Sequence, residues 1–342
     1  MKKLHREGCQ IGQFQPGVRD SIADVEGVLV GHVDIEAGNI QVGLSVVEPY
    51  PLSDGKRRLY IGRWALDGGG RISGLGVAED FGTFSAPIAV VPAPVFGRVY
   101  EALIHQGIGR DSGLSTDAGW PPLVMGMEDG AWNDARRIYE SVRQRDLDRA
   151  LSAASEAVLE GSVGIGHSLR AFGVRGGVGS ASRRFGAQHV GAFVAANGGL
   201  PGDLRVNGRA VPTPVSTVGG PQEFVAVLAT DAPLLPYQLR ALAQRAALGA
   251  SRCKLWNPLT REAQVCVFTT RNSEDDATNV ELERISATDN DMLYALFQAG
   301  AETVESATVS ALCEAKPIQV NGRSLSVLDI RTLMRSNQLY FH

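Results

Sequence analysis

Short apolar runs alternate with glycine-rich turns over much of this sequence. Glycine accounts for 40 of the 342 residues, well above its usual share of about 7%. The glycines follow no G-X-Y period, which excludes collagen, and they gather in segments such as 161–166 and 175–186. Apolar runs stand between such segments at 87–92, 190–196 and 224–229. This pattern is typical of sheets whose short strands are joined by tight turns.

Helical patterns separate several of these strands. Residues 133–134 (Asn-Asp) can cap a helix that runs toward Arg145. Asp231 is expected to cap a second helix, which continues to Ala246. Residues 292–313 predict one amphipathic helix or two. Strands mixed with helices in this way indicate an α/β fold with layered sheets.

Composition and charge exclude several classes of protein. Hydrophobic residues make up 44% of the chain and charged residues 20%, which is typical of a globular protein. No linker and no repeat interrupts residues 1–342, so we expect one compact domain. The net charge of −4 and the absence of a basic stripe argue against a nucleic-acid partner. No apolar run approaches the roughly 18 residues of a transmembrane helix, and none follows the basic N-terminus, so neither a membrane span nor a signal peptide is expected.

The usual metal- and cofactor-binding motifs are missing from the sequence. The cysteines at 9, 253, 266 and 313 are far apart, which favours buried free thiols in a reducing cytoplasm. The histidines are dispersed, and there is no HExxH motif for zinc. The loop 67–76 does not fit the GxGxxG pattern of a dinucleotide site. We therefore expect a cytoplasmic protein that uses no cofactor and no metal.

Several segments, in order along nearly the whole chain, resemble one protein family. The most specific are RGGVGSAS at 175–182 and ATDAPL at 229–234. The others are 20–28, 30–32, 67–75, 129–134, 160–164, 194–197 and 311–313. On these residues the chain resembles the self-processing D-aminopeptidase and β-peptidyl aminopeptidase family. The resemblance implies a four-layer αββα sandwich of the N-terminal-nucleophile (Ntn) hydrolase type. It also implies removal of N-terminal residues from short peptides or amides.

The resemblance further implies a definite mechanism. A member of this family cleaves its own precursor just before a Ser or Thr, whose hydroxyl then attacks the substrate while its freed amine acts as the base. An Asn amide stabilises the oxyanion. A Ser and an acid two residues apart support the nucleophile, and a further acidic residue helps to hold the substrate's free amine. Family members also assemble, so a homo-oligomer or a partner homologue is expected.

The position of the nucleophile is substituted in this chain. Six residues before Ala229, where the family has its Ser or Thr, stands Glu223, and the bond to be cleaved becomes Gln222–Glu223. Glutamate has no hydroxyl for the N–O acyl shift that begins self-cleavage, so we expect the junction at 222–223 to stay uncleaved. A displaced nucleophile at Ser216 or Thr217 is the alternative, although the Gly-Gly-Pro that follows disfavours an early strand start.

The supporting residues are substituted as well. Counting back from the strand at 265–268 places the supporting Ser on Arg261 and the acid on Ala263. The acid that binds the substrate amine falls near Gly126, close to Glu128. Only the oxyanion position matches the family, as Asn197, a residue that is equally at home in a turn before two glycines.

These substitutions leave more than one function open. Glu223 and Arg261 can form an ion pair across the former catalytic centre, or both can point to solvent. One hypothesis is a diverged enzyme, in which Glu223 acts as a general base and Asn197 as the oxyanion donor. The other is a non-catalytic homologue that binds a small peptide, amide or carboxylate ligand, or a partner subunit.

Overall fold

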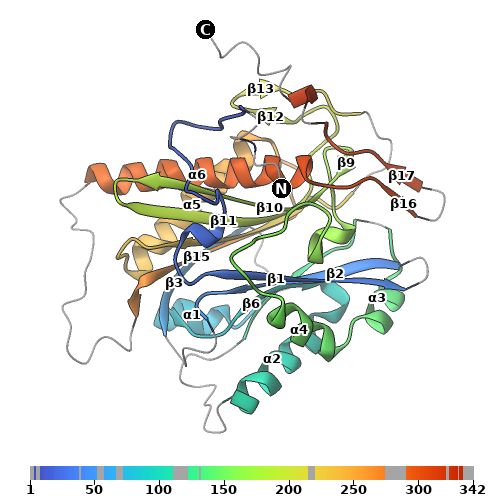
Figure 1. Ribbon diagram of the computed structural model, residues 1–342, viewed down its shortest axis with the longest axis horizontal. Helices are drawn as coiled ribbons and strands as arrows, with labels where there is room; N and C mark the ends of the chain where they lie inside the picture. The colour runs from blue at the N-terminus through green and yellow to red at the C-terminus, as the bar shows by residue number, and fades with distance from the viewer. Residues whose placement is uncertain are drawn as a thin grey trace.

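The computed structural model describes residues 4, 8–37, 40–51, 58–66, 72–110, 122–130, 132–214, 220–273, 290–320, 323–329 and 331–333. Within these residues two sheets stack face to face, and helices cover the outer face of each (Figure 1). The layers are therefore helices, sheet, sheet and helices. This is the four-layer αββα sandwich that the family resemblance implies.

The larger sheet has six strands and carries the residues of greatest interest. Its order is β10-β11-β14-β15-β3-β5. Neighbours are antiparallel except for β14 and β15, which are parallel. The strands are β10 (Gly177–Phe185), β11 (Gln188–Asn197), β14 (Glu223–Thr230), β15 (Glu262–Ser273), β3 (Leu59–Leu66) and β5 (Thr83–Phe84).

The second sheet has five strands in the order β1-β2-β6-β7-β4. Its only parallel pair is β6 with β7. The strands are β1 (Leu29–Ala37), β2 (Ile40–Glu48), β6 (Ile88–Pro92), β7 (Leu123–Met127) and β4 (Ile72–Ser73).

Helices form the two outer layers (Figure 1). The pair α5 (Pro236–Arg252) and α6 (Asn290–Cys313) packs on the six-stranded sheet. On the five-stranded sheet lie α2 (Phe96–Arg110), α3 (Ala135–Ser141) and α4 (Gln144–Ser152). Helix α1 (Leu75–Phe81) contacts β3 and β5.

Short elements connect the layers. The 3-10 helices are η2 (Ile22–Asp24), η4 (Ala93–Val95) and η6 (Gly164–Ser168). The short hairpins are β8 (Arg170–Ala171) with β9 (Val174–Arg175), β12 (Arg205–Val206) with β13 (Arg209–Ala210), and β16 (Ile318–Val320) with β17 (Arg323–Leu325).

The hydrophobic core has one large cluster between each pair of layers. Alternate side chains of the six-stranded sheet enter either the cluster beneath α5 and α6 or the cluster between the sheets. On β14, for example, Ala226 and Leu228 face the helices, whereas Val225 and Val227 face the other sheet. A third cluster joins the five-stranded sheet to α2 and α4. Because these strands are buried on both faces, the side chains that point to either face are apolar, and the strand sequences are nearly continuous apolar runs.

Two of the glycines show why the strands need this residue. A Cβ on Gly179 of β10 would lie 2.0 Å from the carbonyl oxygen of Ala307 in α6. A Cβ on Gly31 of β1 would lie 1.9 Å from the carbonyl oxygen of Ala150 in α4. Both neighbours are backbone atoms that no side-chain movement can relieve. Glycine therefore lets each outer helix approach its sheet closely.

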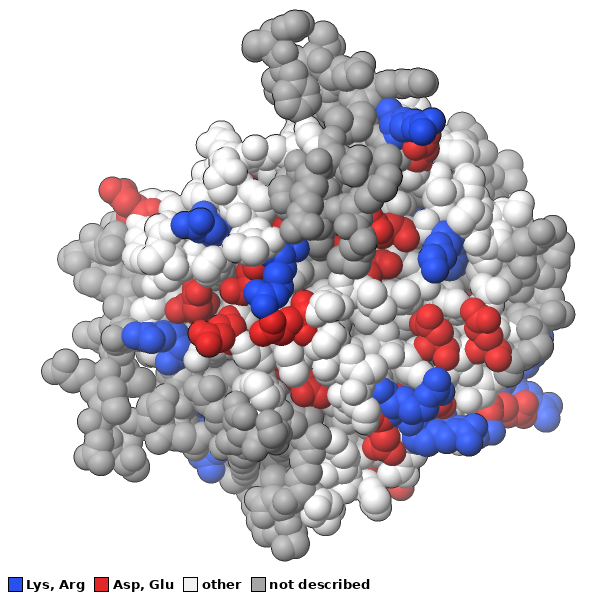
Figure 2. Space-filling model, in the orientation of Figure 1, with Lys and Arg blue, Asp and Glu red and all other residues white. Residues whose placement is uncertain are grey.

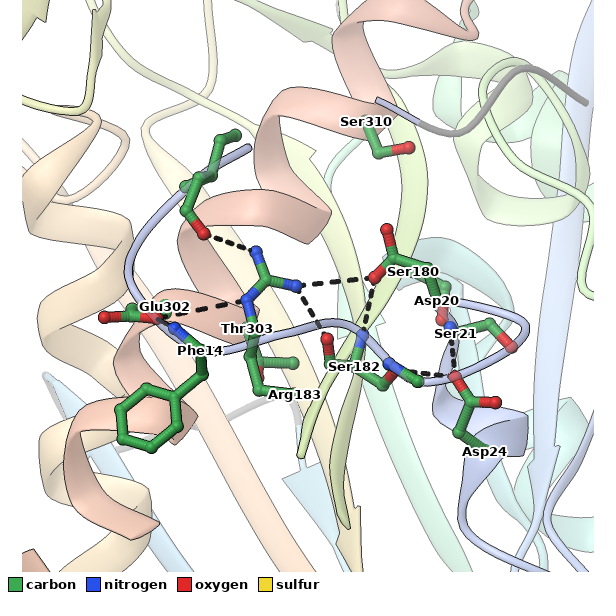
Figure 3. A network of polar contacts seen from close by, with 12 residues as sticks. Phe14, Asp20, Ser21, Asp24, Ser180, Ser182, Arg183, Glu302, Thr303 and Ser310 are labelled. Carbon is green, nitrogen blue, oxygen red and sulfur yellow. Dashed lines mark hydrogen bonds and ion pairs between the residues drawn. The ribbon is translucent and has the colours of Figure 1, made fainter. Parts of the chain in front are cut away.

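A buried ionic network holds the segment before β1 against the six-stranded sheet (Figure 3). Arg183 of β10 lies 3.4 Å from Asp20 and 4.0 Å from Glu302 of α6. Its Nη2 donates to the carbonyl of Ile11 at 2.7 Å, and Glu302 Oε2 accepts the backbone N–H groups of residues 13 and 14 at 2.9 and 3.0 Å. We call Asp20, Arg183, Glu302 and the backbone of residues 11–14 the N-terminal clasp. Every side chain in it is at least nine-tenths buried.

Helix capping agrees with the sequence at one helix and differs at another. Asp134 caps α3 as expected, because its side chain accepts from the backbone N–H groups of Arg136 and Arg137. Asp231 does not cap α5, which begins later, at Pro236. Its carboxylate instead accepts from the backbone of His189 at 2.6 Å and lies 3.0 Å from the ring of the same residue. The expected helix cap at Asp231 is therefore wrong, and Asp231 fastens β14 to β11.

The surface carries charges of both signs. Figure 2 shows Lys and Arg interspersed with Asp and Glu on the face in view, among larger areas of uncharged residues. No helix in the described part of the chain is long and apolar enough to cross a membrane.

Candidate functional site

Three polar residues form one row across the end of the six-stranded sheet. Asn197 is the last residue of β11, and it pairs in register with Glu223, the first residue of β14. Glu223 pairs in turn with Glu262, the first residue of β15. Residues in register on neighbouring strands point to the same face of a sheet. We call Asn197, Glu223 and Glu262 the polar row.

The polar row faces the space between the two sheets. Two and four residues beyond Glu223, Val225 and Val227 belong to the core between the sheets. Four residues beyond Glu262, Cys266 belongs to the same core. Since side chains alternate along a strand, both glutamates open onto the edge of this inner layer.

The carboxylate of Glu223 accepts hydrogen bonds from two neutral donors. Its Oε1 receives the Nδ2 of Asn197 at 2.8 Å and the backbone N–H of Glu128, just after β7 of the other sheet, at 2.6 Å. Glu223 is only 4% exposed and Asn197 is fully buried. One backbone N–H and one amide N–H that converge on an oxygen form the arrangement that stabilises an oxyanion in hydrolases. Here the oxygen belongs to the side chain of Glu223.

The amide of Asn197 is fixed in place by its other contacts. Its Oδ1 accepts the backbone N–H of Arg170 at 3.3 Å, and its Nδ2 also donates to the carbonyl of Glu128 at 2.9 Å. Both ends of the amide are therefore engaged, as a buried polar group requires. Asn197 therefore has a fixed place at the end of β11, and its role as an oxyanion donor stays a prediction.

Gln222, the residue before Glu223, is held by hydrogen bonds to its backbone carbonyl and to its side chain. The carbonyl of Gln222 accepts the backbone N–H of Arg261 at 2.7 Å. The side-chain Oε1 of Gln222 accepts from the backbone of Gly199 at 3.1 Å and from Asn257 at 3.3 Å. The Gln222–Glu223 junction is thus part of an ordered strand start.

Ala263 lies on the opposite face of β15 from Glu262. It is buried in the core beneath α5 and α6. Arg261 precedes β15 and is exposed, whereas Glu223 is buried. The expected ion pair between Glu223 and Arg261 stays a prediction. A shift of one residue in the strand count exchanges the two faces of the strand, so the count from sequence places the supporting acid position, Ala263, on the side that faces the helices.

Glu262 and Gln264 occupy the inner-face positions instead. Gln264 is 1% exposed, and its Nε2 donates to Glu262 Oε1. Sequence reasoning missed both residues. The signal that could have found them is the alternation of Cys266 and Phe268 with Val265 and Val267. Once it is known which of these pairs faces the core between the sheets, the alternation assigns both missed residues to the same face.

Three further sets of residues complete the description of the site. Gly126 is buried in β7, and Glu128 reaches the polar row through its backbone. Ser216 and Thr217 lie outside the described residues. His32 lies 2.9 Å from Ser45, which is fully buried, and burial lowers the pKa of His32 to about 4. This histidine is therefore a neutral structural residue at pH 7.

The cysteines are not activated as nucleophiles. Burial raises the pKa of Cys9 to about 11, and it raises the pKa of Cys253 and of Cys266 to about 12. A thiol with so high a pKa is almost entirely protonated at neutral pH and reacts poorly. Among the described residues, no group of three or more His, Cys, Asp or Glu side chains is arranged to hold a metal ion.

The family model for peptidase family S58 matches residues 20–325, which is most of the chain. The chain belongs to peptidase family S58. A curated relative, the beta-peptidyl aminopeptidase BapA of Sphingosinicella microcystinivorans, is 28% identical over 94% of this chain and 89% of its own length. The resemblance predicted from the sequence motifs is thereby confirmed.

Solved structures of similar aminopeptidases confirm the fold. A Burkholderia sp. beta-aminopeptidase matches with a TM-score of 0.88 and 31% identity over 100% of this chain and 99% of that chain. The L-aminopeptidase D-Ala-esterase/amidase of Ochrobactrum anthropi matches with a TM-score of 0.84 and 27% identity over 96% of both chains. The latter structure is described as a variant of the Ntn hydrolase fold.

Proposed function

We propose that this S58 chain is a diverged aminopeptidase-lineage protein that stays uncleaved and binds a small ligand at the polar row. The observation that carries the proposal is the contact of Asn197 and the Glu128 backbone with the Glu223 carboxylate. In an S58 aminopeptidase the oxyanion donor serves the substrate during attack by a hydroxyl. In this chain the corresponding amide is bound to a carboxylate that stands where the hydroxyl is expected.

The same contact disfavours Glu223 as a general base in hydrolysis. An oxyanion donor must be open to the substrate oxygen as charge develops on it. Here the amide that would supply it already donates to the proposed base and to the Glu128 carbonyl. Ligand binding without the family's usual chemistry is therefore the function that the geometry supports best. Assembly with further copies or with a catalytic homologue stays a prediction.

The first test is the intact mass of freshly purified protein. We expect one species near 36.4 kDa, since glutamate cannot begin the acyl shift. Two fragments whose new N-terminus is Ser216, Thr217 or Glu223 would overturn the proposal. Turnover of amino-acid amides or β-peptides by the uncleaved chain would also overturn it.

A restored triad tests the assignment of the positions. In the variant Glu223→Ser with Glu262→Ser and Gln264→Glu, we expect self-cleavage before residue 223 to rise from none to a measurable fraction. The hydroxyls and the acid would then share the inner face with Asn197. The single variant Glu223→Ser is the control and should remain uncleaved. Equal cleavage in both variants would show that positions 262 and 264 have no part in the site.

A further inference from the structure

Strand β1 is an edge of the five-stranded sheet, and much of its outer side is open. At the start of this edge, Val30 exchanges two backbone hydrogen bonds of 3.1 Å with Ser155 in an antiparallel bridge. Along an antiparallel strand, the N–H and C=O groups of alternate residues point to the same side. The backbone groups of His32, Asp34 and Glu36 therefore point outward, and they have no backbone partner in the described part of the chain. Such a row of unpaired groups is a template for a further strand.

A groove of about 540 Å³ lies beside this open edge. Its volume falls within the range of roughly 300–1,000 Å³ that is usual for binding sites. Helix α4 lies next to β1 (Figure 1) and forms the other wall. The lining residues are 32–34 of β1 and Asp148, Arg149, Ser152 and Ala153 of α4. Strands β2 and β6 separate β1 from β7, which adjoins the polar row, so the groove is a separate site.

The carboxylates of the open edge are held in place by the 3-10 helix η6. Asp34 accepts the backbone N–H of Gly164 at 2.5 Å. The ring of His167 lies 3.2 Å from Glu36 and 4.0 Å from Asp34. Both carboxylate side chains are nevertheless exposed, at 41% for Asp34 and 66% for Glu36. Since neither has a Lys or Arg partner among the described residues, both can receive a cation from outside the chain.

The helix side of the groove adds to this negative charge. Asp148 of α4 is exposed and has no Lys or Arg partner within the described ranges, whereas its neighbour Arg149 is paired with Asp146 at 3.2 Å. An edge strand that carries such carboxylates repels a second copy of itself, because the pairing would bring like charges together. It attracts a strand of opposite charge. The charge of the groove therefore favours a basic occupant over a second copy of this chain.

We propose that the open edge of β1 binds an extended basic segment of a partner protein, which adds as an antiparallel strand beside His32, Asp34 and Glu36. In an antiparallel pair, two residues that exchange backbone hydrogen bonds have their side chains on the same face. The segment's residues that bond to Asp34 and Glu36 therefore direct their side chains toward these two carboxylates. Lys or Arg at alternate positions fits this arrangement. The site goes beyond the proposed function and does not depend on the ligand at the polar row.

The test uses a capped hexapeptide of alternating Lys and Val, titrated into the full-length protein in a calorimeter. We expect saturable binding that weakens as salt is added, since salt screens exposed charges. N-methylation of the Lys residues removes the N–H groups that face β1 and should abolish binding. N-methylation of the Val residues, whose N–H groups point away from β1, keeps the charge and should leave binding nearly unchanged. A peptide with Glu in place of Lys should not bind.

Variants of the chain locate the site. Asp34→Asn keeps an oxygen for the N–H of Gly164, and combined with Glu36→Gln it should weaken peptide binding about fivefold. Glu36→Pro also removes an outward N–H, a change that an edge strand tolerates, and it should weaken binding more than Glu36→Gln does. Glu140→Gln removes an exposed charge on α3 and should leave binding unchanged.

Three results would overturn the proposed strand addition. They are no saturable response to the alternating peptide, equal binding of the two N-methylated peptides, and undiminished binding in the double variant Asp34→Asn with Glu36→Gln. The N-methylated peptides test the pairing on the unaltered protein, so the test holds even if a variant fails to fold.

Two further measurements separate the alternatives. Sedimentation velocity detects the other occupant of the edge: a dimer that Glu36→Pro dissociates would show that β1 pairs with a second copy, and it would overturn the basic segment. Intact mass on the same preparation tests the proposed function by itself. Fragments would overturn that function, whereas a single species that does not bind the peptide would overturn the strand addition alone.

Discussion

The N-terminal clasp and the polar row each contain a buried glutamate, and the two networks hold its charge differently. In the clasp, Asp20 and Glu302 face the guanidinium of Arg183. In the polar row, Glu223 accepts from a backbone N–H and an amide, and its in-register neighbour is a second glutamate. The clasp closes its charges internally, as a structural network must. The row places two glutamates in register at the edge of the inner layer, where we propose that the ligand binds.

The difference also concerns what each network joins. The clasp fastens residues 11–14 to β10 and α6, segments far apart in the sequence (Figure 3). The row joins the ends of three neighbouring strands and the loop after β7. We therefore expect substitutions in the clasp to change stability, and substitutions in the row to change ligand binding more than stability.

The largest effect should follow from removing the cation of the clasp. Arg183→Met leaves Asp20 and Glu302 buried without it, and breaking a buried pair by removing one partner costs about 3–5 kcal/mol. We expect the free energy of unfolding in urea to fall by that amount. Arg136→Met, which removes an exposed Arg paired with Glu140, should leave the free energy of unfolding nearly unchanged, because water screens an exposed ion pair. Similar losses in the two variants would contradict the structural role of the clasp.

A smaller effect distinguishes the two networks directly. Glu302→Gln weakens the contact with Arg183 and the two charge-assisted bonds from the backbone, which should cost about 1–3 kcal/mol. Glu223→Gln keeps a carbonyl oxygen for the Asn197 and Glu128 donors and removes a charge beside Glu262. It should therefore cost under about 1 kcal/mol. Urea unfolding of both variants measures the contrast, and a larger loss at Glu223 would reverse our assignment of the two regions.

The general fold follows from local features of the sequence. Glycine turns between apolar runs predict the layered sheets, and the strands at 190–196 and 224–229 lie within β11 and β14. The position of Glu223 at a strand start comes from the family spacing before Ala229. These features are readable because each depends on residues close together in the chain.

Other parts of the site and the clasp depend on contacts that the sequence does not display. The run 263–268 is apolar on both faces apart from Gln264, so it does not reveal that Glu262 shares the face of Glu223. The Glu128 donor is a backbone N–H, which no residue type marks. Arg183 contacts partners that lie more than a hundred residues before and after it in the sequence. The sequence alone therefore does not distinguish it from an exposed Arg.

The smallest effect concerns the pH dependence of the region beside the clasp. Burial raises the pKa of Glu305 above its ordinary value, against the opposing influence of the Asn207 backbone and Arg252. The folded chain thus binds this proton more tightly than the unfolded chain does. Glu305 then contributes no penalty at pH values below its ordinary pKa of 4.5, and it destabilises the fold increasingly as the pH rises through its folded pKa. Glu305→Gln should therefore gain stability relative to the wild type as the pH rises from about 4.5 toward neutrality.

Urea unfolding at a series of pH values between 4.5 and 7 measures this slope. Glu223→Gln is the matched comparison, because it changes the same residue type in the other network. If the stability of Glu305→Gln relative to the wild type is constant across the series, Glu305 titrates normally and burial does not set its charge. If the relative stability falls as the pH rises, the bonds from Asn207 and Arg252 outweigh burial, and the carboxylate is stabilised by its partners. In that case the charges around α6 are satisfied by their partners as fully as those of the clasp.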